Sequence, residues 1–270
     1  MNIQVEITSH CNLKCIECPQ RLMKRDRQHL ALPIFDMITD KLVDKYKPGT
    51  IIVHKDGEPL LHPHFEQIIG KIALTTSAKV DIYTNGKLLR KELIGFLGSF
   101  HNRFSILVSF HLYNYDGKKN DYEEIGERLL ECLSVGATNV EFILATHSTD
   151  LTSEEELTEW KKYWEEKQKL FPRLTGVHVN TAINPWTGLI EQKNTITFPA
   201  CPYADGEHLF VGVTGNIIPC CMDLEEEVIF GNVADDNLSK VMIERDRFYK
   251  DLRDKKVEKD LCQRCLQAPT

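Results

Sequence analysis

Three cysteines stand close together near the start of the chain. Cys11, Cys15 and Cys18 are separated by three and two residues, and no fourth cysteine lies nearby. Zinc is usually held by four ligands. His10 and Cys132 could complete a zinc site, but His10 abuts Cys11, and Cys132 falls on an apolar helical face where core packing is expected. Thiolates also hold iron–sulfur clusters, and a [4Fe–4S] cube on three thiolates keeps one iron free for another ligand.

A second group of thiols occupies the C-terminal third of the chain. Cys220 closes a G-x4-C unit, Cys262 and Cys265 form a C-x2-C pair, and Cys201 lies upstream of both. These four thiols could close around one zinc ion or one [4Fe–4S] cluster. The spacing selects Cys220 over the adjacent Cys221, which is then expected to be a packed neighbour.

Polar residues follow several expected strands. Asp56-Gly57-Glu58-Pro59 comes after the second strand and Tyr83-Thr84-Asn85-Gly86 after the third, while Ser109 and Thr146 end the fourth and fifth. Each motif alone could be a simple turn. In barrels of βα units, however, functional groups collect at the carboxyl ends of the strands.

Over the first ~180 residues, short apolar runs alternate with helical runs. This alternation favours an α/β fold with a parallel sheet, whose strands would position these residues. Six strands fit either a partial (β/α) barrel or an open wound sheet. The expected strands are Ile3–Ile7, Ile51–His54, Val80–Tyr83, Ser105–Phe110, Val140–Ala145 and Val177–Asn180.

The pattern changes after residue 182. A hairpin is expected from Leu209–Val213 and Ile217–Ile218, and a helix from Leu238 to Leu252. We therefore expect two domains, residues 1–182 and residues 183–270.

Composition indicates the cellular compartment in which the chain works. The chain has 270 residues, and its N-terminus lacks the pattern of a secretory signal. Nine cysteines in such a chain indicate metal or redox groups in a reducing, cytoplasmic compartment. No apolar run approaches the ~20 residues that span a bilayer.

The net charge of −7 excludes general nucleic-acid binding, which depends on basic groups. One local basic stretch, Arg21, Lys24, Arg25 and Arg27, is expected to be a solvated loop rather than a phosphate grip.

The C-x3-C-x2-C motif after the first strand resembles that of the radical S-adenosylmethionine (SAM) superfamily. The resemblance implies a partial (β/α)6 barrel whose [4Fe–4S] cluster chelates SAM and cleaves it to a 5′-deoxyadenosyl radical, which abstracts a substrate hydrogen. Ile16 stands one position further from the third cysteine than the usual aromatic residue. The remaining implied SAM contacts are Asp56, Gly57, Glu58 and Pro59 at the amino group, Thr84 and Asn85 near the cofactor, Ser109 at the ribose or carboxylate, and Thr146 near the adenine.

The C-terminal cysteines resemble the auxiliary-cluster "twitch" domain, a shortened SPASM domain with a hairpin and a helix. The resemblance implies a second [4Fe–4S] cluster on Cys201, Cys220, Cys262 and Cys265. The further cysteines of a full SPASM domain are missing, so one auxiliary cluster is expected. Four thiolates leave no open iron, which favours electron transfer and a net oxidation. A flavodoxin or ferredoxin is the implied reductant.

The chain is similar in size and motifs to twitch-containing dehydrogenases of aminocyclitol biosynthesis. This similarity implies a small, polar, sugar-like or cyclitol-like substrate, held between the two clusters. The candidates for catalytic or substrate contacts are His54, His111, Tyr113, Asn184 and Trp186, with Asn180 also in the lining.

Two alternatives remain open. A radical SAM maturase would act on a ribosomally made peptide, although the chain begins at its first strand, without an added peptide-recognition domain. A non-enzymatic zinc or iron–sulfur protein would explain the cysteines, but not Asp56-Gly57-Glu58-Pro59 or the polar residues at the strand ends.

Overall fold

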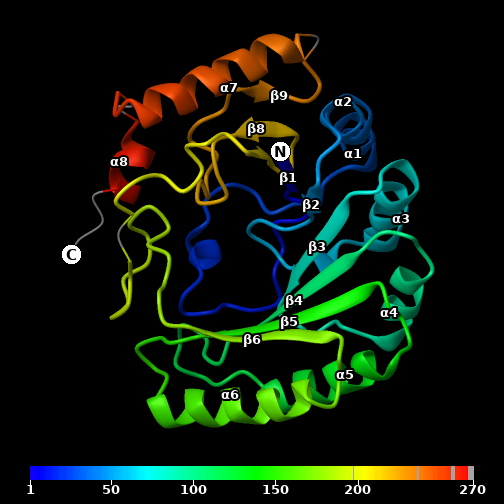
Figure 1. Ribbon diagram of the computed structural model, residues 1–270. Helices are drawn as coiled ribbons and strands as arrows, with labels where there is room; N and C mark the ends of the chain where they lie inside the picture. The colour runs from blue at the N-terminus through cyan, green and yellow to red at the C-terminus, as the bar shows by residue number, and fades with distance from the viewer. Residues whose placement is uncertain (197, 236, 257–258, 267–270) are drawn as a thin grey trace.

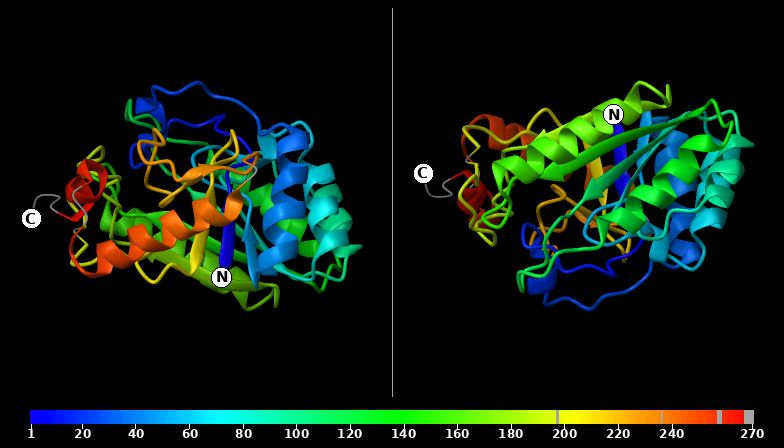
Figure 2. Two further views of the ribbon diagram at one scale, coloured as in Figure 1. Left: turned by 90° about the horizontal axis from the view of Figure 1, so that it is seen from above. Right: turned by 90° about the horizontal axis from the view of Figure 1, so that it is seen from below.

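One open sheet of nine strands organises the chain (Figure 1). The computed structural model describes residues 1–196, 198–235, 237–256 and 259–266. The strands lie in the order β6-β5-β4-β3-β2-β1-β7-β8-β9, so β1 is central rather than at an edge (Figure 2). Their bounds are β1 Asn2–Val5, β2 Thr50–Ile52, β3 Lys79–Thr84, β4 Phe104–Phe110, β5 Val140–His147, β6 Leu174–Asn180, β7 His208–Val211, β8 Asn216–Ile218 and β9 Gly231–Asn232.

The first six strands are parallel, as the alternation of strands and helices predicts. Apolar residues alternate along these strands and are buried on the face that the helices cover, whereas the other face carries polar residues such as Gln4, Asp81 and Ser109. In β4, Phe104, Ile106, Val108 and Phe110 are all fully buried. The sheet curves without closing, which confirms the partial barrel and sets all six carboxyl ends around one hollow.

Helices line the convex side of this sheet (Figure 1). Side chains at the helix starts stabilise them by accepting backbone hydrogen bonds: Asp121 accepts from Glu124 N in α5, and Ser153 accepts from Glu156 N in α6. None of the helices that the structure describes combines the length and the apolar character needed to cross a bilayer. The helices are α1 Leu32–Ile38, α2 Asp44–Tyr46, α3 Phe65–Thr75, α4 Lys91–Gly98, α5 Tyr122–Ser134, α6 Glu154–Gln168, α7 Leu238–Arg253 and α8 Asp260–Leu266, with 3-10 turns η1 Pro19–Leu22 and η3 Pro59–Leu61 and a π-helical segment η2 Thr39–Val43 between α1 and α2.

The C-terminal region extends the same sheet. The expected hairpin is present as β7 and β8, and its turn places Gly215 at a φ of 85°, a conformation that glycine adopts without strain. The pairing of β7 with β1, in parallel and in the register Ile3↔Leu209, was not expected from the sequence. The division at residues 182 and 183 stays a prediction, because the sheet runs continuously through both parts.

Candidate active site

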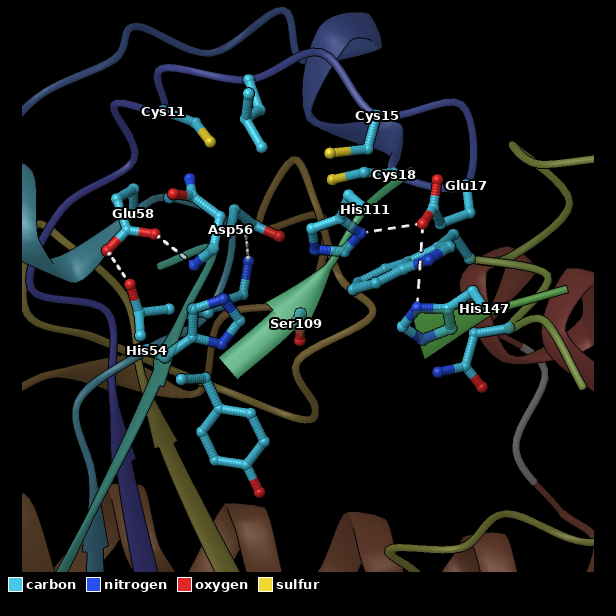
Figure 3. A pocket seen from close by; sticks show the side chains of 18 of the residues that line it. Cys11, Cys15, Glu17, Cys18, His54, Asp56, Glu58, Ser109, His111 and His147 are labelled. Atoms are coloured by element: carbon cyan, nitrogen blue, oxygen red, sulfur yellow. Dashed lines mark hydrogen bonds and ion pairs between the residues drawn. The ribbon is translucent and has the colours of Figure 1, made fainter. Parts of the chain in front are cut away.

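A cavity of about 380 Å³ lies at the carboxyl ends of the parallel strands (Figure 3). Each neighbouring strand contributes polar residues to its wall, because parallel strands end at the same edge of the sheet. The lining residues that carry the argument are Cys11, Cys15, Glu17 and Cys18 after β1, His54, Lys55, Asp56 and Glu58 after β2, Thr84 and Asn85 at β3, Ser109 and His111 at β4, His147 at β5, Asn180 at β6, and Asn184 and Trp186 in the loop beyond it.

The N-terminal cysteines line one end of this cavity (Figure 3). Burial raises the pKa of Cys11 to about 11 and that of Cys18 well above its usual value, and the charge of Cys15 raises both further. The three thiols are therefore close enough to influence one another, and His111 is a positively charged neighbour that lowers the pKa of Cys11 only in part. A thiolate-binding metal centre supplies further positive charge, so this donor set fits an iron–sulfur cluster.

Glu58 is held rigidly beside the cysteines. Its carboxylate accepts hydrogen bonds from Thr84 Oγ1 (2.8 Å), the Asn85 backbone nitrogen (2.7 Å) and the Leu60 backbone nitrogen (3.1 Å). The side chain is buried, which raises its pKa to about 7. Gly57 has no room for a side chain, since a Cβ there would lie 2.6 Å from the His10 carbonyl oxygen. The motif after β2 thus presents one preorganised carboxylate to the cavity.

A buried charge network lies next to Glu58. Lys55 donates to the Asp56 carboxylate and, over 2.8 Å, to the Asp223 carbonyl oxygen. Arg25 Nη2 contacts Glu6 Oε1 at 2.6 Å and Asp56 Oδ2 at 2.9 Å. Burial raises the pKa of Asp56 to about 6, while Lys55 opposes that rise. The expectation that Arg25 is solvated is wrong, because buried carboxylates from separate segments draw it inward.

Glu17, His111 and His147 form a cluster on the opposite wall (Figure 3). His111 Nδ1 lies 2.8 Å from Glu17 Oε1, and the two imidazole rings stack at 5.6 Å. Glu17 Oε2 and His147 Nδ1 are buried without a hydrogen-bond partner among the described residues. One ligand atom from each side chain lies within 4.8 Å of the others, so the cluster could hold a metal ion or a polar group of a ligand.

Sequence reasoning missed Glu17 and His147. The only available signal was position: Glu17 directly precedes Cys18, and His147 follows Thr146 at the end of a strand. Burial raises the pKa of Glu17, but His111 and His147 together hold it below its usual value. Burial lowers the pKa of His111, but Cys15 and Glu17 raise it well above its usual value.

His54 faces the cavity from the end of β2. Its ring stacks on Tyr83 at 5.6 Å, and its ring nitrogens form no hydrogen bond with the described residues. Burial lowers its pKa to about 4, so the imidazole is neutral at pH 7. Across the cavity, Trp186 and Thr187 have φ values of 46° and 57°. Such left-handed residues are strained and are typical of functional loops.

Four residues expected at the site do not line the cavity. Tyr113 turns outward, where its hydroxyl donates to Glu156 Oε2 at 3.2 Å. Thr146 is completely buried, and its hydroxyl donates to the Phe110 carbonyl oxygen. Ile16 lies outside the lining because its neighbours Cys15 and Glu17 take the inward positions, and Pro59 instead begins the short turn η3.

The C-terminal thiols lie close enough to one another for their charges to interact. Burial raises the pKa of Cys262 to about 12 and that of Cys265 to about 11, and the charge of Cys201 contributes to both. Cys220 is also influenced by Cys201. Cys221 instead lies 3.1 Å from the Tyr203 hydroxyl. This thiol-rich donor set fits an iron–sulfur cluster. The charge of Cys221 also raises the pKa of Cys265, so the choice of Cys220 over Cys221 as a ligand stays a prediction.

Comparisons with known proteins agree with this geometry. Residues 201–266 match the SPASM family, an iron–sulfur cluster-binding domain. The chain is 23% identical over 272 residues to the S-adenosyl-L-methionine-dependent 2-deoxy-scyllo-inosamine dehydrogenase of Niallia circulans, covering 97% of this chain and 91% of that protein. It is 25% identical over 126 residues to the subtilosin biosynthesis protein AlbA of Bacillus subtilis, covering 44% of this chain and 27% of that protein.

Solved structures share the fold. BtrN in complex with AdoMet and 2-DOIA superposes with a TM-score of 0.65 at 21% identity, covering 98% of this chain and 91% of that one. Streptococcus suis SuiB bound to its precursor peptide SuiA gives a TM-score of 0.70 at 14% identity, covering 98% of this chain and 69% of that one.

The SPASM match, the similarity to a SAM-dependent dehydrogenase and the shared fold together support the prediction, made from the cysteine motifs, of a radical SAM enzyme with a C-terminal SPASM domain. The same findings support the predictions that the chain is an oxidoreductase and that its cofactors are SAM and iron–sulfur clusters.

Proposed function

We propose that this enzyme oxidises a secondary alcohol of a small, polar, cyclitol-like or sugar-like molecule to a ketone. The observation that carries the proposal is the similarity to the Niallia circulans dehydrogenase, which extends over 97% of this chain and therefore includes both cysteine groups. The lining of the cavity supports it. Asn180 and Asn184 offer hydrogen-bonding groups at separate points of the wall, which suits a ligand rich in hydroxyl or amino groups.

Each cysteine group would hold one [4Fe–4S] cluster. Cys11, Cys15 and Cys18 would hold the first cluster, which would provide the electron needed for reductive cleavage of SAM. Cys201, Cys220, Cys262 and Cys265 would hold the second, which accepts the electron released by the oxidation. We infer a cytoplasmic location, since such clusters need a reducing compartment, and a flavodoxin or ferredoxin as reductant.

The chain's own residues would orient SAM. The fixed carboxylate of Glu58 would accept a hydrogen bond from the amino group of SAM, while Thr84 and Asn85 keep that carboxylate in place. Ser109, at the end of β4, faces the same cavity and would contact the ribose.

His54 would accept the substrate proton. It is neutral at pH 7, lines the cavity and has ring nitrogens without partners among the described residues. The stacked Tyr83 ring fixes the plane of the imidazole. Trp186, at the rim of the cavity, would cover the ligand from the loop after β6.

The test is anaerobic turnover of 2-deoxy-scyllo-inosamine by the reconstituted protein with SAM and dithionite. The proposal expects one ketone and one 5′-deoxyadenosine for each SAM consumed. Deuterium on the oxidised carbon should appear in 5′-deoxyadenosine. Formation of 5′-deoxyadenosine without any oxidised product from this or related cyclitols would reject the substrate class while leaving the SAM chemistry intact.

A second candidate is maturation of a ribosomally made peptide. The similarity in fold to SuiB, a structure that contains its precursor peptide, is the observation in its favour. A short peptide oxidised or cross-linked under the same conditions, with no activity on cyclitols, would establish it.

A further inference from the structure

A basic hollow lies on the outer side of the cysteine loop. It has a volume of about 560 Å³, and its wall includes Cys11, Lys14, Arg21, Arg27 and Tyr115. The sequence marked this stretch as basic without giving it a purpose. In the structure, Arg25 belongs to the buried charge network, whereas Arg21 and Arg27 line the hollow.

The charges at the hollow are not neutralised. Lys14, Arg21 and Arg27 are exposed, and none of them forms an ion pair within the part of the chain that the structure describes. Arg21 lies over the Tyr115 ring at 5.5 Å, and Arg27 Nη2 donates to the Gln20 carbonyl oxygen at 3.0 Å. Both guanidinium groups are thus positioned by neutral partners. In a chain of net charge −7, this is a local positive field.

The hollow and the cavity share a wall. Cys11 and Leu13 each line both the hollow and the cavity. A protein seated in the hollow would therefore approach the N-terminal thiols without entering the cavity that holds SAM and substrate. Because electron transfer slows steeply with distance, this is a favourable approach for an electron donor.

We propose that this basic hollow docks an acidic one-electron carrier protein. The proposal rests on the proposed function, which requires an electron for every SAM cleaved. One electron leaves the reduced carrier, which is oxidised by one electron, and enters the cluster held by Cys11, Cys15 and Cys18. No proton or chemical group is exchanged between the two proteins.

Charge complementarity selects this partner. Because the chain has a net charge of −7, most of its surface repels an acidic carrier, whereas the hollow attracts it. Such electrostatic steering raises association rates. Leu22 and Tyr115 are 37% and 50% exposed and provide a small apolar contact beside the charges. Small interfaces of this kind are typical of transient redox encounters. Nucleic acid is disfavoured, since three basic side chains replace few counterions.

The experiment compares the double variant Arg21→Glu/Arg27→Glu with Lys162→Glu/Lys169→Glu, which makes the same charge change at exposed lysines on α6 and at its C-terminal end. The first readout is the affinity of oxidised flavodoxin for the reconstituted protein, measured by calorimetry at low and moderate salt. We expect the first variant to bind at least about tenfold more weakly and with less dependence on salt, because rim charges govern both. The control variant should change by less than about twofold, as expected for charges outside the interface.

The second readout is SAM cleavage with two reductants. Cleavage driven by reduced flavodoxin should fall in the Arg21→Glu/Arg27→Glu variant, and cleavage driven by dithionite should not. Equal flavodoxin affinity in the two variants would overturn the docking site. If the variant instead lost affinity for a short RNA while flavodoxin binding was unchanged, the hollow would be a nucleic-acid site and the proposal wrong. Failure of the unmodified protein to cleave SAM with dithionite would refute the proposed function, while the affinity measurement would still test the hollow.

Discussion

Replacing Glu58 by glutamine tests the SAM site with one atom changed. The carboxylate is 2% exposed and accepts hydrogen bonds from Thr84, Asn85 and Leu60, so the variant has little freedom to relocate. Glutamine can keep its carbonyl oxygen toward Asn85 N, but its amide group then meets the Leu60 N–H, which loses its acceptor. The charged acceptor for SAM is lost as well.

The size of the effect follows from that loss. A hydrogen bond to a charged group contributes about 1.5–3 kcal/mol, which corresponds to about 10-fold to 150-fold weaker SAM binding. Affinity in the unmodified protein should also fall as the pH drops through about 7, the pKa to which burial raises Glu58, because protonation removes the charged acceptor. The Glu58→Gln variant should lack this part of the pH dependence.

The assay is calorimetric titration of anaerobically reconstituted protein with SAM between pH 6 and pH 8. Glu66→Gln is the matched control, since Glu66 is exposed and its ion pair among the described residues is with Arg90. Iron content and thermal unfolding of each variant establish that the cluster and the fold are retained. If Glu58→Gln bound SAM within about twofold of the unmodified protein, with full iron content, the assigned role of this carboxylate would be refuted.

Three further predictions concern the chemistry. Cys15→Ala should abolish 5′-deoxyadenosine formation, and retained cleavage would contradict the role of the cysteine triplet. Cys262→Ala should still cleave SAM but form no ketone, and normal turnover would exclude electron exit through the C-terminal thiols. His54→Gln should lower the rate of ketone formation by about 10²-fold to 10⁴-fold, the usual contribution of a general base, with SAM affinity unchanged; an unaltered rate would assign the proton to another group. Because burial lowers the pKa of His54 to about 4, its basic form is lost only as the pH falls through that value, so this group should not limit activity above about pH 5.

Local spacing was sufficient for much of the fold. The apolar runs that became β3, β4 and β5 differ from their expected bounds by at most two residues at either end. The cysteine triplet and Asp56-Gly57-Glu58-Pro59 are short contiguous motifs, and their place after consecutive parallel strands brings them to one edge of the sheet. The resulting cavity therefore contains most of the residues that the motifs indicated.

Contacts between distant segments could not be predicted in this way. Glu17 and His111 are 94 residues apart, and only the order of strands in the sheet brings them together. Arg25 looked like one member of a basic run because its partners Glu6 and Asp56 come from two other loops. The placement of β7 beside β1 is equally non-local. Tyr113 was assigned to the cavity from its position after β4, but Glu156 on α6 draws its hydroxyl outward.

The central claim is that two separate groups of cysteines hold two iron–sulfur clusters. Iron and sulfide content per chain, measured without oxygen in the unmodified protein and in the Cys11→Ala/Cys15→Ala/Cys18→Ala variant, tests it most directly. The account predicts about eight irons in the former and about four in the latter, as two cubes and one cube require. Zinc in place of iron at either group, or an iron content that the triple substitution leaves unchanged, would contradict it.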